Sequence, residues 1–205
     1  SAWQARALSE SNPVVAVEAS IALARHGDRE DPQLTRDLYS NLATIEWSEL
    51  SKIGRVGLLR AYGLASIRLA AVDDATRLAV AQRFDVRFPD SETELNQELC
   101  RLLAYLEAPR VVEKTLRLLR GALSQEEQIH YALCLRNVIA GATPDQQREY
   151  FRWFRNTGDI RGGYSLRKFI ENIKQDAVDQ LDDEQKNLLA EVLEPVVEQD
   201  AIEQA

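Results

Sequence analysis

Apolar residues recur along this chain at steps of three and four positions, the spacing that places side chains on one face of an α-helix. The run from Pro13 to Arg25 is the first clear case, and Gly27 ends it. Four apolar residues of this run share one helix face: Val14, Val17, Ile21 and Ala24. Similar runs follow along the chain, and none alternates with the period of two that a half-buried strand requires. The pattern therefore predicts an all-α fold.

Helix-start signals divide the chain into these runs. Asp31 stands before Pro32, and Asp73 stands before Asp74, so a capping carboxylate precedes each of two apolar runs. Three pairs of residues match the capping box, in which each side chain accepts a hydrogen bond from the backbone of the other: Ser91 with Glu94, Ser124 with Glu127, and Thr143 with Gln146. We also expect helices to begin near Ser48, Pro109, Gly163 and Asp182, the last one running through Leu193.

The spacing of the helix starts predicts an array of repeats. The second helices of successive pairs begin near residues 13, 48, 91, 124 and 163, which are 35, 43, 33 and 39 residues apart. Helical-hairpin repeats have periods of about 33–47 residues, because one hairpin buries its apolar face only against its neighbours. The helix predicted over 124–140 is apolar on two sides, as a sandwiched helix would be. We therefore expect an α-α superhelix of about five hairpins that forms one domain over residues 1–194. A compact helical bundle is the competing interpretation.

Small residues form a stripe on the helix that is predicted to follow Ser48. The stripe consists of Gly54, Gly57, Ala61 and Ala65, at steps of three, four and four. A glycine inside a helix costs about 1 kcal/mol relative to alanine, so two of them in one stripe need a compensating cause. Close packing against another backbone is one cause, and a kink or break at the glycines is the other. We favour close packing, and the sequence leaves both open.

Net charge limits the partners of this chain. Of its 205 residues, 25 are basic and 33 are acidic, which gives a net charge of −8. Nearly all of the imbalance lies after residue 181, where the only basic residue is Lys186, and we expect the segment 195–205 to fray as an acidic tail. The near-neutral remainder lacks the basic field that attracts phosphate backbones, which disfavours nucleic acid as a partner. No apolar stretch approaches the roughly 20 residues of a membrane span.

Few residues offer metal or catalytic chemistry. With only His26 and His130, the chain cannot assemble a three-histidine zinc site, and the step from Glu127 to His130 lacks the second half of a di-iron site. Cys100 and Cys134 lie in consecutive repeats and outside any Cys-x-x-Cys pair. Two buried thiols are the favoured state, and a disulfide between them remains open. Because no nucleophile can be matched to a base, we expect no catalytic residue, no metal and no cofactor.

The best small candidate for a binding site precedes the helix expected after Gly163. The candidate anion or ligand site consists of Arg161, Gly162, Gly163, Tyr164, Arg167 and Lys168. Backbone N–H groups of the first helical turn, the helix dipole and these cations could converge there on an anion. The alternative, which we favour, is a tight interhelix turn over the aromatic residues at 150–154.

Three segments resemble one protein family. They are residues 95–100 and 105–109 (Leu-Asn-Gln-Glu-Leu-Cys and Tyr-Leu-Glu-Ala-Pro), residues 125–133 (Gln-Glu-Glu-Gln-Ile-His-Tyr-Ala-Leu), and residues 150–154 (Tyr-Phe-Arg-Trp-Phe) with Arg161-Gly162-Gly163 and Phe169. They resemble the helical, HEAT-like region of large exported planctomycete-type proteins. In those proteins the region lies between a sorbosone-dehydrogenase-like β-propeller, or a similar domain, and a C-terminal c-type cytochrome domain. The resemblance spans about residues 47–193.

The resemblance implies a noncatalytic α-solenoid connector, exported to the periplasm with its neighbours, that sets the position of a heme domain relative to a propeller. Its partners would be proteins, either the flanking domains or another chain. No functional residue carries over, because the heme-binding motif of such proteins lies beyond this segment. Two alternatives remain open: a HEAT-like DNA-binding or DNA-repair glycosylase enzyme, and a free-standing peptide-binding helical repeat protein.

Overall fold

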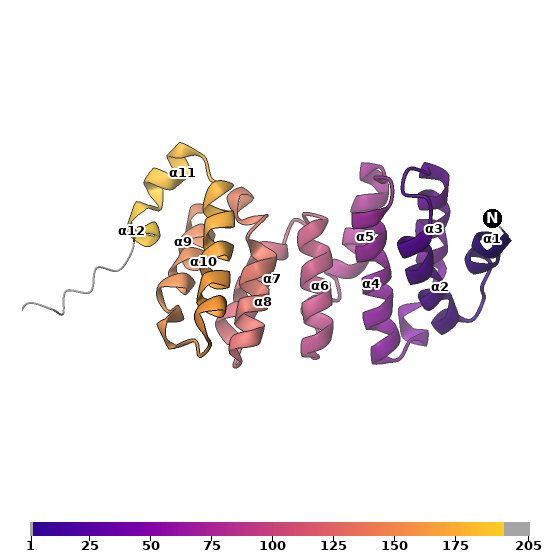
Figure 1. Ribbon diagram of the computed structural model, residues 1–205, viewed down its shortest axis with the longest axis horizontal. Coiled ribbons are helices and arrows are strands. Elements are labelled where there is room, and N and C mark those ends of the chain that lie inside the picture. Colours follow the sequence, from indigo (N-terminus) through magenta and orange to yellow (C-terminus); the bar gives the residue numbers. More distant parts are fainter. Residues whose placement is uncertain (1, 195–205) are drawn as a thin grey trace, which may run out of the picture. The chain divides into compact units, whose positions relative to one another are not determined.

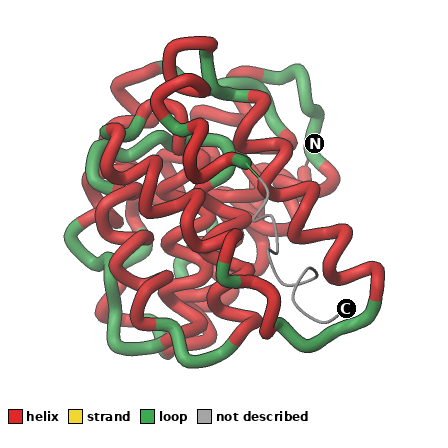
Figure 2. The backbone as a smooth tube through the Cα atoms, turned by 90° about the vertical axis from the view of Figure 1, so that its left-hand side faces the viewer, coloured by secondary structure: helices red, strands yellow, loops and turns green. Residues whose placement is uncertain are grey.

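The computed structural model describes residues 2–194, and the regular elements in this range are all helical (Figure 1, Figure 2). Since the described residues contain no strand, the all-α prediction is confirmed. The chain divides into two compact units, one up to Val111 and one from Val112 onward. The expected single domain over 1–194 and the superhelix of about five hairpins stay predictions. The expected acidic tail, 195–205, lies outside the described residues.

The first unit has α4 (Lys52–Arg68) at its centre. α4 packs against α2 (Pro13–His26) and against α6 (Thr93–Tyr105), so these three helices follow one another in space (Figure 1). α3 (Pro32–Thr44) packs against α2 and α4, and α5 (Asp74–Asp85) packs against α6. The unit also contains α1 (Ala2–Leu8), which packs against α2 and α3, and a 3₁₀ turn, η1 (Trp47–Glu49), before α4. The buried apolar side chains of α4 form the middle of this core: Leu58, Leu59, Ala61, Tyr62 and Ala65.

Two helix starts in the first unit follow the sequence prediction. The carboxylate of Asp31 accepts hydrogen bonds from the backbone N–H groups of Gln33 and Leu34, at 2.8 and 3.2 Å. The carboxylate of Asp73 accepts one from the backbone N–H of Thr76 at 2.7 Å. These bonds satisfy N–H groups that have no partner inside the first helical turn.

Two other starts differ from the prediction. The capping box of Ser91 with Glu94 is wrong: α6 begins after Glu92, and no side chain caps it. The buried Asn96 instead fixes this turn, because its side chain accepts a hydrogen bond from Asp90 N at 2.7 Å and donates one to Asp90 O at 2.8 Å. The helix expected from Ser48 begins at Lys52, since Ser51 is its cap and residues 47–49 form η1.

The small-residue stripe on α4 lies against neighbouring side chains. α4 is helical from end to end, so the glycines do not break it. A Cβ atom at Gly57 would lie 2.9 Å from Cγ1 of Val17 on α2, and one at Gly54 would lie 3.1 Å from Cδ2 of Leu50. Ala61 and Ala65 are fully buried. The structure therefore supports close packing as the cause of the stripe.

Two glycines of α4 provide a test of this packing. Gly57→Ala is expected to lower the free energy of unfolding by about 1 kcal/mol, because the overpacking penalty of about 1–3 kcal/mol against buried Val17 exceeds the gain in helix propensity. Gly63→Ala, on the same helix with no atom near its Cβ position, is expected to raise it by about 0.5–1 kcal/mol. Urea denaturation measures both. Equal stabilisation by the two substitutions would contradict the close approach at Gly57.

The second unit packs its helices around aromatic side chains. Its elements are α7 (Val111–Gly121), α8 (Gln125–Leu135), η2 (Ile139–Gly141), α9 (Pro144–Arg155), η3 (Thr157–Asp159), α10 (Tyr164–Asp179), α11 (Asp183–Leu188) and α12 (Ala190–Leu193). α9 packs against α10 and α12, and α8 packs against α10. The ring of Tyr150 lies edge-on to those of Phe151 and Phe154, with both centroid distances 5.1 Å. Its hydroxyl donates to Ala132 O at 2.9 Å, which ties α9 to α8.

Side chains at the turns set the helix boundaries of this unit. The capping box of Thr143 with Gln146 is confirmed, whereas Ser124 accepts from Glu127 N and no reciprocal bond completes its box. The helix predicted over 124–140 ends at Leu135 and is followed by η2. Buried Gln147 donates to the carbonyls of residues 139 and 140, and the carbonyl of Ile139 also accepts from Ala142 N within η2. Asp182 caps α11 as expected, but the last helix divides at Leu189 into α11 and α12.

Candidate functional site

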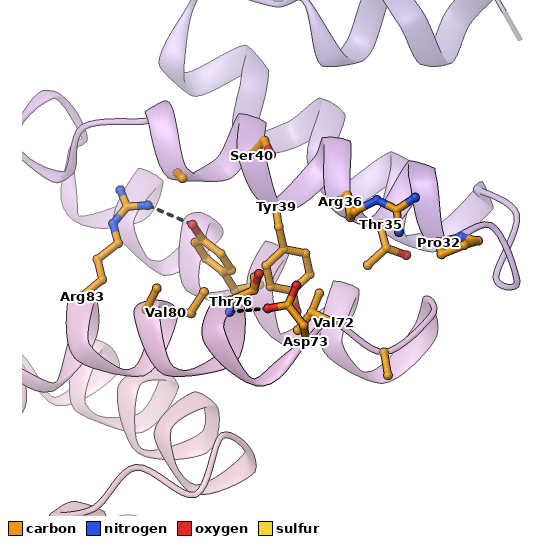
Figure 3. Close-up of a pocket in the computed structure, with 14 residues that line it drawn as sticks. Pro32, Thr35, Arg36, Tyr39, Ser40, Val72, Asp73, Thr76, Val80 and Arg83 are labelled. Carbon is orange, nitrogen blue, oxygen red and sulfur yellow. Dashed lines mark hydrogen bonds between the residues drawn. The ribbon is translucent and has the colours of Figure 1, made fainter.

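A cleft of about 760 Å³ opens between α3 and α5 in the first unit (Figure 3). The two helices run in the same direction along it, with Pro32 near one end and Arg83 at the other. The residues of α3 that line it recur at steps of three and four, so they share one helix face: Pro32, Thr35, Arg36, Tyr39, Ser40 and Ala43. From α5 and the segment before it come Ala71, Val72, Asp73, Thr76, Ala79, Val80 and Arg83, and Tyr62 comes from α4.

Arg83 closes one end of the cleft and joins three helices. Its Nη1 donates to Leu42 O and to the hydroxyl of Tyr62, both at 2.9 Å, and its Nη2 donates to Ile45 O. Leu42 and Ile45 lie at the C-terminus of α3, where carbonyls lack helical partners and the helix dipole is negative. The guanidinium also lies 5.3 Å from the ring centroid of Phe84. Arg83 therefore holds the end of α3 against α4 and α5.

Tyr39 and Tyr62 are two buried tyrosines that line the cleft. Their rings meet edge-on with centroids 5.6 Å apart, and the hydroxyl of Tyr39 lies 2.6 Å from Oγ of Ser66. Burial raises the pKa of Tyr62 to about 12, although the charge of Arg83 opposes this shift. Burial also raises the pKa of Tyr39, against the effect of its hydrogen bond to Ser66. Both phenols are therefore protonated at neutral pH, and neither can act there as a phenolate base.

Other polar groups of the cleft, Asp73, Thr35 and Arg36, also take part in the fold. Asp73 is exposed, and the backbone N–H of Thr76 holds the pKa of its carboxyl below the usual value. Thr35 is buried, and its hydroxyl donates to Asp31 O at 3.2 Å. Arg36 donates to the side chain of Gln33 at 2.8 Å. These groups can position or contact a bound molecule, but they do not form a nucleophile–base pair.

A second cavity, of about 730 Å³, lies in the second unit and is lined by three arginines and three carboxylates among other residues. Arg120 pairs with Glu149 at 3.2 Å, and Arg148 pairs with Asp145 at 2.8 Å. Oε1 of Glu149 is buried and has no hydrogen bond of acceptable geometry, so the ion pair is its one close polar contact within the described residues. The cavity is thus electrically balanced, with no excess of one charge.

The residues of the predicted anion site lie at the start of α10. Gly163 is the residue before the helix, and Tyr164 is 76% exposed, with Arg167 and Lys168 exposed beyond it. The carboxamide of Gln125 accepts from Arg161 N and donates to Arg161 O, both at 3.0 Å. Lys168 pairs with Glu171 at 3.2 Å. Gln125 thus holds this turn to the start of α8, and neither cavity described above includes residues 161–168. The anion site stays a prediction.

The histidine and cysteine residues do not gather into a metal centre. Within residues 2–194, no three His, Cys, Asp or Glu side chains are grouped so that they could hold a metal ion. Both cysteines are thiols: Cys100 is buried, whereas Cys134 is half-buried, so the prediction of two buried thiols holds for Cys100 only. Sγ of Cys134 lies 3.5 Å from Nε2 of His130, one helical turn earlier.

Sequence reasoning did not identify Tyr39, Tyr62 and Arg83 as site residues. Tyr39 belongs to the same apolar stripe as Leu38 and Leu42, and it therefore looks like an ordinary core residue. Arg83 is a basic residue in the last turn of α5, a signal that predicts stabilisation of that helix rather than of α3. The proximity of 39, 62 and 83 comes only from the packing of three helices.

Comparison of the chain with protein-family models, with curated proteins and with solved structures finds no match. Among the described residues, no helix is long and apolar enough to cross a membrane.

Proposed function

We propose that this chain is a noncatalytic α-solenoid scaffold or protein-interaction module, in which HEAT-like helical hairpins stack as an α-α superhelix. The observation that carries the proposal is the packing of the first unit. α2, α4 and α6 are every second helix of the chain, and they pack against one another in order. This is the arrangement that stacked hairpins require, because each hairpin covers the apolar face of the next.

The polar side chains of the cleft support a noncatalytic role. Arg83 caps the end of α3, Asp73 caps α5, and the hydroxyl of Tyr62 accepts from Arg83. Groups whose hydrogen bonds already hold helices together are less able to exchange a proton with a bound molecule. The cleft is therefore better suited to binding than to chemistry.

As part of a longer protein, such a module would be the connector that the family resemblance implies, exported to the periplasm and located between a propeller and a heme domain. Support for this role comes from the segments at 95–109, 125–133 and 150–169. The encoded residues after Ala205 test it. A Cys-x-x-Cys-His motif downstream supports the connector, and a continuation without this motif contradicts it.

Solution scattering tests the superhelix. A compact domain of 205 residues is expected to have a radius of gyration of about 17 Å. A superhelix stacks its hairpins in one direction, so we expect a clearly larger value, with a distance distribution that has one early maximum and a long decline. A value near 17 Å with a symmetric distribution would indicate a closed bundle and would contradict the proposal.

A further inference from the structure

Three arginines of the first unit surround two neighbouring aromatic rings. The guanidinium carbons of Arg55 and Arg87 lie 5.4 and 5.5 Å from the ring centroid of Trp47. The guanidinium carbon of Arg83 lies 5.3 Å from the centroid of Phe84, and the rings of Phe84 and Trp47 meet edge-on at 5.9 Å. We call these five residues the arginine–tryptophan cluster. Arg83, at one end of the cleft, belongs both to the cleft and to this cluster (Figure 3).

The charge of this cluster is not balanced by carboxylates. None of its three arginines forms an ion pair with a residue in 2–194, whereas Arg60 on the same helix as Arg55 pairs with Glu98 at 3.0 Å. Glu46 and Glu49 stand beside Trp47 in the sequence, and neither lies within ion-pair distance of the cluster. Arg55 and Arg87 therefore share the indole of Trp47 without a carboxylate partner in the described chain.

Several N–H groups of the cluster are open to a partner. Arg83 uses its donors within the fold, so it is a positioning residue. Arg55 uses Nε to donate to Trp47 O at 3.2 Å, and Arg87 uses Nη1 to donate to Arg83 O. Both Nη groups of Arg55, and Nε and Nη2 of Arg87, have no acceptor among residues 2–194. A guanidinium edge of this kind can donate two parallel hydrogen bonds to one carboxylate.

One exposed apolar side chain lies directly beside an arginine of the cluster in the sequence. Val86, which precedes Arg87, is 77% exposed. Tryptophan and arginine are the residues that most often dominate the binding energy of protein interfaces, and apolar neighbours exclude water around them. A free anion would make no use of such side chains. The composition of the cluster therefore favours a polypeptide partner over a free phosphate or other small anion.

We propose that the arginine–tryptophan cluster is the docking surface for an acidic segment of a protein partner. Carboxylates of that segment pair with Arg55 and Arg87, and its apolar side chains cover the indole of Trp47. The inference rests on the proposed function as an interaction module, and it names the chemistry of the partner and the surface that binds it. Desolvation by the partner strengthens both the ion pairs and the cation–π contacts.

The indole N–H signals of the protein report on this surface. The chain has three tryptophans, so ¹H–¹⁵N spectra contain three indole signals, and Trp47→Phe assigns the one from Trp47. The probe is a capped hexapeptide, Glu-Glu-Leu-Glu-Glu-Leu, titrated at low ionic strength. We expect a saturable shift of the Trp47 signal, with the signals of Trp3 and Trp153 unchanged. The Gln-Gln-Leu-Gln-Gln-Leu peptide is expected to produce no saturable shift.

Substitutions separate a specific surface from a general charge effect. Arg55→Gln and Arg87→Gln are each expected to weaken binding of the acidic peptide up to about fivefold, since each removes one solvent-accessible ion pair. The matched control is Arg25→Gln, which removes the same charge from an exposed position on α2 and is expected to leave the affinity unchanged. Thermal unfolding and circular dichroism confirm that each variant is folded.

Three results would overturn the inference: no saturable shift at Trp47, equal weakening by Arg25→Gln and Arg55→Gln, or inorganic phosphate reaching half-saturation at the same concentration as the peptide. The last would indicate a site for a free anion. Solution scattering of the same samples distinguishes failure of the docking surface from failure of the superhelix. An elongated chain that does not bind contradicts the docking surface alone, and a compact chain that binds contradicts the superhelix alone.

Discussion

Replacement of Phe151 by alanine is expected to lower the free energy of unfolding by about 3–5 kcal/mol, the cost of removing a buried phenyl ring and leaving a cavity. Phe151 is fully buried in the second unit, with its ring centroid 5.1 Å from that of Tyr150 and 6.4 Å from that of Phe154. Domains are stable by only about 5–15 kcal/mol, so this loss is a large share of the total. Urea denaturation followed by circular dichroism measures this loss. We expect a lower midpoint concentration of urea and an unchanged dependence of the free energy of unfolding on urea concentration.

Two further substitutions control this result. Phe151→Leu keeps most of the apolar volume and is expected to cost less than Phe151→Ala. Leu123→Ala removes an apolar side chain that is 98% exposed, and it is expected to change stability by no more than about 0.5 kcal/mol. If Phe151→Ala cost no more than Leu123→Ala, the aromatic core of the second unit would be wrongly assigned.

Arg83→Ala is expected to destabilise the protein by about 3 kcal/mol. The substitution leaves two carbonyls at the end of α3 and the hydroxyl of Tyr62 without their donor, and hydrogen bonds to a charged group contribute about 1.5–3 kcal/mol each. We expect a loss smaller than the sum of the three bonds because Arg83 is half-buried and water can replace part of them. Chemical denaturation gives the free energy, and hydrogen exchange at the C-terminal turn of α3 shows where the opening occurs.

The shape of the guanidinium group matters for Arg83. Arg83→Lys keeps the charge, but one ammonium cannot reach three acceptors in the geometry of the planar fork, so we expect it to recover less than half of the loss. Tyr62→Phe removes only one of the three acceptors and is expected to cost about 1 kcal/mol. Full recovery by Arg83→Lys would show that the helix dipole, rather than the set of hydrogen bonds, explains the role of Arg83.

Much of the helical structure could be predicted because its causes are local. Asp31, Asp73 and Thr143 cap the helices that the sequence assigned to them, since a cap bonds backbone groups only two or three residues away. Ser91 carries the same local signal, but its side chain does not cap α6. There the side chain of Asn96, six residues away and buried on the helix that packs against α4 and α5, binds the backbone of Asp90 instead.

The candidate site could not be predicted in the same way. The anion site was predicted from a local pattern, and in the structure Gln125, 36 residues earlier, holds the backbone of Arg161 in that turn. The cleft depends on Tyr39, Tyr62 and Arg83, which come from three helices and share no sequence motif. The arginine–tryptophan cluster likewise combines residues of η1, α4 and α5.

The sequence by itself determined that this chain is helical and where most of its helices start, because apolar periodicity and caps act over one or two turns. The sequence left open whether the glycines of α4 mark close packing or a kink, and the structure places Gly57 close to Val17 on α2. Tertiary structure decided which residues meet: that Arg83 caps α3 rather than its own helix, and that three arginines share the surface of Trp47 and Phe84. These contacts depend on helix packing, because the side chains come from different helices and no sequence pattern relates their positions.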